Sequence, residues 1–378
     1  MSLLTQFYPS STGGEGSGYT GLVNSVYSST LVQDVLSCAY NGVTGWYYLL
    51  VQYVNTETQE SDVRVGRTPV AVTLVSRDGE SWSMSSSFPY LGNSASWVIG
   101  QQAMVAPPAG SSDAVTLTSW SDSSSGSSTD RNIGYSESPT QPVSFSQSSL
   151  GTATGTSYLS TFYDRTDGTY VALTKANPPA RALSNDGVTW SSSMSTIPLP
   201  GSPAGCSFAY RYYTDIYAYQ GTNLLRSTNA GSSWSTVTTS LPTNLGAIVA
   251  GGEGNGVMTS TGGYYSTDHG LTWTAWNPGP DNITTVGGMV YNEKADVFVG
   301  KSTTLKTVVV STDGTGSQWR IAAPGNTELQ AQMYSSTNWV TAPGMDIYMV
   351  PPALGSLRGA GIPSTNQRFI CKVDASSL

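Results

Sequence analysis

Short apolar runs recur along the chain, and each is followed by a cluster of small polar residues and glycine. The runs Ala71–Val75 and Lys306–Val310 are rich in β-branched residues, which is typical of strands. The clusters that follow them contain Asp, Asn, Ser and Gly, the residues that form tight turns. This pattern predicts an all-β chain of many short strands joined by tight turns.

One turn motif, S-x-D-x-G followed by Trp, recurs five times with small changes in length, and a sixth copy at 136–145 is degenerate. We expect the Asp or Asn to bond its own backbone two residues on, the Gly to take a positive φ, and the Trp to cover the turn from the next strand. The turn residues predicted to be structural are Ser76, Asp78 and Trp82; Ser184, Asp186 and Trp190; Ser227, Asn229 and Trp234; Ser266, Asp268 and Trp273; and Ser311, Asp313 and Trp319.

A second repeat precedes the first and consists of a strand end with a Tyr, a tight turn and a new strand. Its clear copies carry Tyr40, Tyr163, Tyr210, Tyr291 and, in the last copy at Met333–Val340, Tyr334; weaker copies lie near Ala103 and Ala250. Tyr40 and Tyr334 are 294 residues apart, which over six intervals gives 49 residues per unit. Four strands of about 5–6 residues with their loops fill such a period, which is the size of one β-propeller blade.

The repeats therefore predict a β-propeller of four-stranded antiparallel blades. Seven blades are favoured, and six blades with a tail are the alternative. The predicted blades are roughly 30–90, 91–150, 151–200, 201–243, 244–280, 281–325 and 326–378.

The five clear turns resemble Asp-boxes, the repeats of sialidases and of other Asp-box (BNR-type) β-propellers. The resemblance covers about residues 35–350. It implies the propeller fold and places these turns on the hairpin between the third and fourth strands, away from the active face.

The two ends of the chain have to meet if the ring is to close. We predict that residues 1–29 form an N-terminal arm and that 30–378 form one propeller. Within the arm, Thr5–Tyr8 could pair with the C-terminal strand Arg368–Val373, and the glycine-rich segment Thr12–Gly18 could act as a flexible tether.

Composition narrows the class of protein. Only 11% of residues are charged, with 41 Gly, 22 Tyr and 10 Trp, which argues against disordered chains and helical bundles. The net charge of −8 argues against a nucleic-acid partner, because no basic field attracts phosphate. No apolar stretch is long enough to insert into a membrane.

The ionisable side chains offer little chemistry. One histidine, His269, excludes a multi-histidine metal site, and we expect it to be an exposed turn residue. Cys38, Cys206 and Cys371 lack metal-ligand spacing, and three buried thiols are favoured over one disulfide with an odd thiol. We predict no metal and no cofactor.

An enzyme is the less favoured prediction. The Arg-Ile-Pro motif of sialidases is absent, since neither Arg64 nor Arg67 is followed by Ile-Pro, and none of the catalytic set can be carried over. Another glycosidase would need two carboxylates about 5–10 Å apart. The candidates also fit solvated turn or loop residues: Glu57, Glu60, Asp62, Asp113, Glu253 and Asp281.

Topology predicts where a site would lie. In an up-and-down blade, the turns between strands 1–2 and 3–4 share one face, and the 2–3 turns and the connections between blades share the other. The second face, here called the long-loop face, carries the longer segments 55–68, 121–132, 175–181, 277–283 and 351–367. Its predicted binding residues are Arg64, Arg67, Arg131, Lys175, Arg181 and Arg358.

Tyrosines at 210, 212, 213, 217 and 219 could stack on sugars, but their place in a hairpin favours packing between blades.

Three functions remain open. A non-catalytic structural or adhesion module of a virus particle, such as a phage capsid or tail decoration or a receptor-binding propeller, is favoured. This prediction rests on three observations: a propeller scaffold without catalytic residues, a low lysine content of five residues, and a start of the sequence that does not resemble a secretory signal. Its partners would be other virion proteins or a host surface glycan, and it could be oligomeric. The alternatives are a diverged glycan-acting hydrolase and an assembly factor like the propeller that helps to build photosystem II.

Overall fold

A computed structural model gives the fold of the chain. It describes residues 19–21, 30–55, 70–84, 97–98, 102–122, 128–136, 146–154, 159–174, 179–191, 195–197, 206–252, 256–312, 314–322, 325, 327–336, 338–350, 370–375 and 378.

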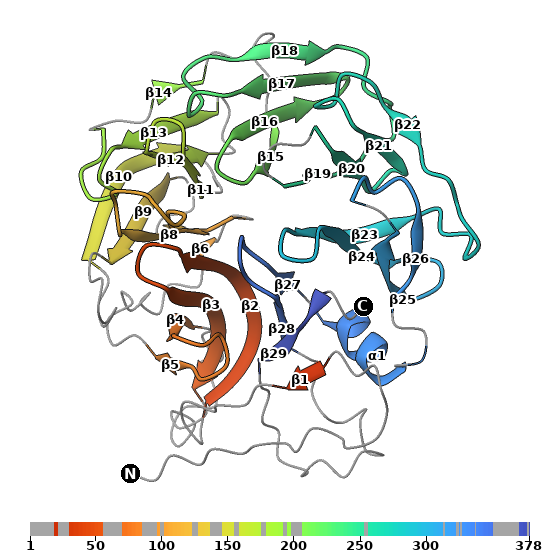
Figure 1. Cartoon of the computed structure of the whole chain (residues 1–378). Coiled ribbons are helices and arrows are strands. Elements are labelled where there is room, and N and C mark those ends of the chain that lie inside the picture. The colour runs from red at the N-terminus through yellow and green to blue at the C-terminus, as the bar shows by residue number, and fades with distance from the viewer. Residues whose placement is uncertain are drawn as a thin grey trace.

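The described residues form seven antiparallel sheets arranged in a ring, and the fold is a β-propeller (Figure 1). The first three sheets are β2 (Thr30–Asn41), β3 (Trp46–Asn55), β4 (Val70–Ser76) and β5 (Ser83–Met84); β6 (Trp97–Val98), β7 (Met104–Val105), β8 (Thr116–Asp122), β9 (Ser128–Ser136) and β10 (Ser146–Thr154); and β11 (Leu159–Asp164), β12 (Thr169–Thr174), β13 (Ala180–Ser184) and β14 (Ser195–Thr196). The next three are β15 (Ser207–Arg211), β16 (Asp215–Gln220), β17 (Asn223–Ser227) and β18 (Ser235–Thr238); β19 (Ile248–Ala250), β20 (Met258–Ser260), β21 (Tyr264–Ser266) and β22 (Thr274–Ala275); and β23 (Val286–Asn292), β24 (Val297–Ser302), β25 (Thr307–Ser311) and β26 (Trp319–Ile321).

The last sheet joins the two ends of the chain. Its order is β1 (Tyr19–Gly21), β29 (Cys371–Val373), β28 (Ile347–Met349) and β27 (Trp339–Val340), and Thr20 lies opposite Lys372. The N-terminal segment that pairs with the C-terminal strand is therefore Tyr19–Gly21. The predicted closing strand Thr5–Tyr8 and the tether Thr12–Gly18 lie outside the described residues.

Middle strands are covered on both faces by the neighbouring sheets, so they are mainly apolar and buried along their whole length. All six residues of β12 and all five of β25 are buried. Between the third and fourth sheets, Phe162 and Leu173 belong to one apolar cluster with Ile216 and Leu225. Burying one such side chain stabilises the fold by roughly 1.5–3 kcal/mol.

A buried polar residue ends the inner strand of four sheets and bonds to the next sheet in the ring. Asn41 donates its amide to Ala114 O at 2.8 Å, and Asp164 accepts from Ala230 N at 2.8 Å. Arg211 lies 3.0 Å from His269 Nδ1, and Asn292 donates to Met345 O at 2.9 Å. Each is 0–1% exposed and follows a Tyr of the second sequence repeat, so this position, here called the inner-strand polar position, links sheet to sheet.

Four of the five repeated turns are described in full, and each closes on its own Ser and Asp or Asn. In the second, Asp186 accepts from the backbone N–H of Val188 and Thr189 and from the Ser184 hydroxyl. Gly187 has a φ of 73°, and the Trp190 indole donates back to Gly187 O at 3.1 Å. In the fifth turn Asp313 lies outside the described residues, as does 137–145 of the degenerate copy.

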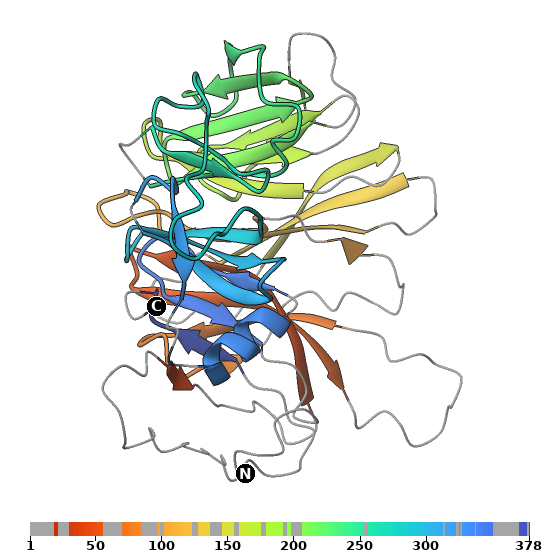
Figure 2. The same cartoon turned by 90° about the vertical axis from the view of Figure 1, so that its right-hand side faces the viewer.

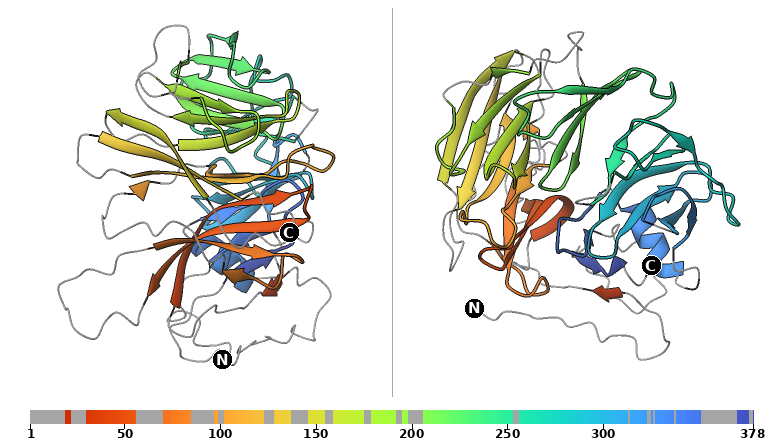
Figure 3. Two further views of the ribbon diagram at one scale, coloured as in Figure 1. Left: turned by 90° about the vertical axis from the view of Figure 1, so that its left-hand side faces the viewer. Right: turned by 45° about the horizontal axis from the view of Figure 1, so that its top comes forward.

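One segment differs from the sequence prediction. Met333 and Tyr334, expected to end a strand, lie in the helix α1 (Thr327–Ser335), and Trp339–Val340 is the inner strand of its sheet. The segment is rich in helix formers, and Leu329 and Met333 lie four residues apart, so both face the core on one side of the helix. Figures 2 and 3 show α1 beside the ring, and they show β9 and β10 projecting beyond the other sheets.

The inner-strand polar position can be tested with Asn292→Ala. The substitution leaves Met345 O without its donor, and the expected loss in the free energy of unfolding is about 1–3 kcal/mol, measured from urea denaturation. Asn223→Ala, at an exposed position in β17, is the matched control and should cost less than about 0.5 kcal/mol. Equal losses in the two variants would contradict the role given to this position.

The turn motif predicts a pH effect for Asp186→Asn. Burial acts to raise the pKa of Asp186, but the hydrogen bonds from Thr189, Val188 and Ser184 outweigh it and lower the pKa to about 2. A lowered carboxyl pKa stabilises the fold above the unfolded value of about 3.9, and this contribution disappears as the pH falls through about 2. Asn229 already occupies the equivalent position in the next repeated turn, where its amide oxygen accepts from the Ser227 hydroxyl and from a backbone N–H, so the variant should fold.

We expect Asp186→Asn to lower the urea midpoint slightly at pH 7 and to have a smaller effect as the pH approaches 2. A difference between variant and parent that stays constant from pH 7 to pH 2 would refute this.

Candidate functional site

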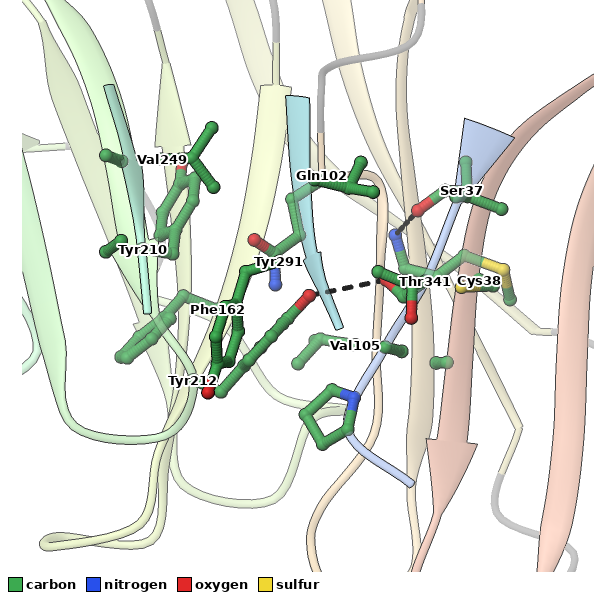
Figure 4. A pocket seen from close by; sticks show the side chains of 18 of the residues that line it. Ser37, Cys38, Gln102, Val105, Phe162, Tyr210, Tyr212, Val249, Tyr291 and Thr341 are labelled. Carbon is green, nitrogen blue, oxygen red and sulfur yellow. Dashed lines mark hydrogen bonds between the residues drawn. The ribbon is translucent and has the colours of Figure 1, made fainter. Parts of the chain in front are cut away.

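The inner strands of all seven sheets converge on one cavity of about 430 Å³. Its lining comes from β2, β7, β11, β15, β19, β23 and β27 and from residues next to them. Figure 4 shows side chains from opposite sides of the ring pointing into this space. A cavity of this size is within the range of pockets that hold small ligands.

The walls of the cavity are mainly aromatic and aliphatic. Phe162 and Tyr210 come from neighbouring sheets, and their rings are stacked with centroids 5.8 Å apart. Phe208, Tyr291 and Val249 extend the same apolar wall (Figure 4). Burial raises the pKa of Tyr210 and Tyr291, so their hydroxyls are neutral at physiological pH.

Tyr212 crosses the cavity. It lies in the turn after β15, and its hydroxyl donates to Thr341 O, beyond β27, at 3.3 Å (Figure 4). These two sheets are not neighbours in the ring, so the bond spans the space between them. The Tyr212 side chain therefore obstructs the cavity near the ends of the inner strands, on the side of the turns between first and second strands.

The other end of the cavity lies on the side of the long loops and carries the one charged residue among the described lining residues. Lys301 lies near the end of β24, half-buried, with Nζ 5.0 Å from the centroid of the Trp339 ring. Its ammonium donates to Ser336 O. Asn338, beside it, donates to Asp34 Oδ2 at 2.8 Å.

The described lining residues include no carboxylate and no imidazole. A pair of acidic groups suited to glycoside hydrolysis is therefore not found in the wall of this cavity as described. Within the described part of the chain, no group of three or more His, Cys, Asp or Glu side chains could hold a metal ion. Cys38, Cys206 and Cys371 are buried with no disulfide between any two of them, and burial raises the pKa of the Cys38 thiol.

A polar cluster lies outside the cavity, where the fourth and fifth sheets meet. Arg211 Nη1 is 3.4 Å from Asp215 Oδ2, and Arg226 Nη2 is 3.0 Å from Asp215 Oδ1. His269 Nδ1 lies 3.0 Å from both Arg211 Nη1 and the Tyr217 hydroxyl. The Arg211 side chain is 1% exposed, and its Nε and Nη2 have no hydrogen-bond partner among the described residues.

His269 is not the exposed turn residue that the sequence predicts, because its ring is half-buried against Arg211. A guanidinium can only donate, so Nδ1 accepts and the neutral ring carries its proton on Nε2. Burial lowers the pKa of His269, and the charges of Arg211 and Arg226 lower it further against the opposing effect of Asp215. Nothing in the sequence around His269 signals this contact, because Arg211 lies 58 residues away.

Of the six predicted binding residues, Arg181 is the one whose side chain the structure describes. Arg64, Arg67, Lys175 and Arg358 lie outside the described residues. Arg131 is in β9 opposite Ser121, and its side chain is not described.

Arg181 contacts the next repeated turn, where its guanidinium donates to Ala230 O at 3.0 Å and to Ser232 Oγ at 2.9 Å. The loop 277–283 packs along β26, where Asp281 accepts from Ile321 N at 2.8 Å. In the structure, Arg181 therefore packs between two sheets, and the loop 277–283 packs along one.

The tyrosine run has three roles. Tyr210, Tyr212 and Tyr213 line the cavity, whereas Tyr219 accepts from Ile248 N of the next sheet at 3.2 Å. Tyr213 packs edge-on against Tyr163 of the preceding sheet. Tyr217 belongs to the polar cluster. The sequence repeat signals the Tyr positions but does not show which of them face the cavity.

No helix among the described residues has the length and hydropathy needed to cross a membrane.

Comparison with solved structures supports the propeller fold. YCF48 bound to a D1 peptide has a TM-score of 0.51 at 10% identity, covering 94% of this chain and 98% of that chain. The α-L-arabinofuranosidase Arb93A from Fusarium graminearum has a TM-score of 0.39 at 12% identity, covering 92% and 98%. The microbial sialidase Hz136 has a TM-score of 0.37 at 11% identity; the match covers 56% of this chain and 46% of the sialidase. No family model matches the sequence, and no curated protein does.

The polar cluster predicts a depressed histidine pKa. The chain has one histidine, so its ring NMR signals are unambiguous. We expect a pKa below 6.5 and the Nε2–H tautomer, and we expect Arg226→Gln to raise the pKa because one neighbouring positive charge is removed. Arg320→Gln, which removes a charge elsewhere, is the control. A pKa at or above 6.5 in the parent protein would show that the charge of Asp215, which raises the pKa, outweighs burial and the two arginines.

The same shift has a consequence for stability. Because the folded-state pKa lies below the unfolded value, the unfolded chain binds more protons, and the fold loses stability as the pH falls below about 6.5. This loss should be smaller in a His269→Gln variant.

Proposed function

We propose that the chain is a non-catalytic binding propeller that holds part of a protein neighbour at the central cavity, entering from the long-loop face. The observation that carries this proposal is the composition of the cavity wall. It is apolar and aromatic, with one cation and no acidic group among its described residues. Such a wall suits the burial of an apolar side chain and lacks the two carboxylates that glycoside hydrolysis requires.

A protein partner fits this wall better than a sugar does. Sugars present hydroxyls on every edge, and a site for them needs a matching number of hydrogen-bonding side chains. Of the polar side chains in the described wall, Ser37 accepts from Met104 N, Asn338 bonds Asp34, and Tyr212 bonds Thr341. These polar groups would have to exchange their present bonds for bonds to a sugar, whereas apolar side chains lose no hydrogen bond on entering. YCF48, a structure of similar fold, is described with a D1 peptide bound, so a propeller of this kind can hold a peptide.

The setting we propose is a virus particle, in which the propeller serves as a structural or adhesion component and its neighbours are other particle proteins. Support comes from the composition, which is poor in lysine and charge and rich in Gly and Tyr, as is common for surface β-scaffolds without a catalytic set. Antibodies raised against the purified chain should label intact particles from the same source. Labelling confined to the cytosol of the source cells would remove this part of the proposal.

The binding role is tested on two arrays, one of peptides from candidate partner proteins and one of glycans. We expect the purified chain to bind peptides and to release no sugar. Val249→Trp, which fills the cavity, should abolish peptide binding, because Val249 is part of the wall. Val43→Trp is the matched control: Val43 is 40% exposed in the turn between β2 and β3, and this variant should bind normally.

Sugar release in the same incubation would establish a glycan-acting hydrolase instead. Sugar binding without peptide binding would make the chain a lectin. Peptide binding that survives Val249→Trp would move the site away from the cavity.

A further inference from the structure

Lys301 is half-buried and, unlike the exposed Lys294 and the more buried Lys372, forms no ion pair among the described residues. Lys294 Nζ lies 2.9 Å from Asp346 Oδ1, and Lys372 Nζ lies 3.0 Å from Glu80 Oε1 and 3.5 Å from Asp346 Oδ2. Lys301 forms no ion pair with any described carboxylate. It contacts the Ser336 carbonyl and the face of the Trp339 ring.

Asp34, whose charge acts on Lys301, has hydrogen-bond partners on both of its carboxylate oxygens. Asp34 Oδ1 accepts from Val35 N at 2.9 Å, and Oδ2 accepts from Asn338 at 2.8 Å. Burial lowers the pKa of Lys301, and the charge of Asp34 only partly opposes this. An ammonium that is half removed from water without a counter-ion is costly unless something pairs with it.

The ammonium has donors to spare. A lysine carries three N–H groups, and one of them is used on Ser336 O. The Trp339 ring faces the ammonium, while its own indole N–H donates to Gly288 O. Lys301 is one of the lining residues of the cavity, so the N–H groups not used on Ser336 O are available to a group bound there.

We propose that this end of the cavity binds the C-terminal residue of a partner polypeptide, with its terminal carboxylate on Lys301 and its apolar side chain among the aromatic residues of the wall. This inference rests on the proposed binding function and specifies which part of the partner enters. The carboxylate supplies the missing counter-ion, and an ammonium–carboxylate hydrogen bond is among the stronger kinds.

A chain end fits the cavity better than a chain passing through it. Tyr212 crosses the cavity at the far end and bonds to Thr341, so a segment entering from the long-loop face meets an obstruction. A cavity of about 430 Å³ holds a residue or two rather than an extended strand. One cation in the wall also matches a single negative charge, not a polyanion, in a protein whose net charge is −8.

The test uses peptides with the twenty possible C-terminal residues, each made as the free acid and as the amide. Binding is measured by the change in tryptophan fluorescence or by calorimetry. We expect free acids that end in an apolar or aromatic residue to bind at least tenfold more tightly than their amides. Equal binding of acids and amides, or no binding of either, would overturn the proposal.

Lys301→Met keeps the length and apolar stem of the side chain and removes the charge. We expect it to bind the free acids at least tenfold more weakly and to bind acid and amide alike. Lys306→Met is the matched control, because Lys306 is exposed in the turn after β24 and should bind as the parent does. Circular dichroism and urea midpoints of the two variants establish that both are folded.

Two further comparisons make the result specific. The first comparison is between a decapeptide and the N-acetylated form of its C-terminal amino acid, because it distinguishes a polypeptide ligand from a small carboxylic acid. Equal affinity of the two would refute a polypeptide ligand. If the chain binds internal peptides through the cavity while acid and amide do not differ, the C-terminal inference fails and the proposed binding function stands. If Val249→Trp also has no effect, both fail.

Discussion

A buried polar side chain at the end of the inner strand fixes how one sheet sits on the next. Apolar packing between sheets is strong but non-directional, so it alone would allow neighbouring sheets to shift. Asn41, Asp164 and Asn292 each direct a buried hydrogen bond to a defined atom of the following sheet. Because a buried polar group without its partner is costly, only one relative placement satisfies all of these bonds. These bonds remove the small errors in placement that would otherwise accumulate from sheet to sheet. Ring closure through β1 and β29 depends on their removal.

Arg211 fills the same position with a charged side chain, and the surrounding residues follow from that exchange. A fully buried guanidinium needs an anion, and Asp215 at the start of β16 supplies one. Asp215 also pairs with Arg226, so one carboxylate serves two cations. The neutral Nδ1 of His269 accepts a hydrogen bond from Arg211 without adding charge to the cluster. This explains why the histidine is held in its neutral form, although its turn position tolerates other residues.

The repeats carry most of what can be predicted from the sequence. The turn motif and the Tyr-containing hairpins have a local physical basis, and they give the all-β class, the four-stranded antiparallel sheets and the propeller fold. Segments without a repeat are less predictable. The helix at Thr327–Ser335 lies where a Tyr-containing hairpin was expected, because two apolar side chains four residues apart bury as well on a helix as on a strand. The closing strand Tyr19–Gly21 has no distinctive pattern, since any short segment can add to an open sheet edge by backbone bonds alone.

The site is harder to predict than the fold, because its residues come together only when the ring is formed. Arg181 and Lys301 are both cations near the long-loop ends of strands, and nothing in the sequence separates them. In the structure, Arg181 reaches the turn of the next sheet, whereas Lys301 points to the space at the centre. The difference follows from position within the sheet: β13 is the third strand and lies against a neighbouring turn, while the residue on β24 is one strand from the axis.

The same geometry explains why a half-buried ammonium can persist at the centre. Trp339 on the inner strand β27 and the Ser336 carbonyl, just after α1, both contact the ammonium and hold it beside the cavity. Closing a ring of twisted sheets leaves a space at the axis, and the side chains there are set by closure rather than by their own best packing. Tyr212 fills one end of that space, and the charged side chain of Lys301 lines the other. A scaffold that is stable by its sheet-to-sheet contacts can therefore keep, in the cavity wall, a cation with no ion pair to any described carboxylate, and the cost of that charge becomes binding energy for the right anion.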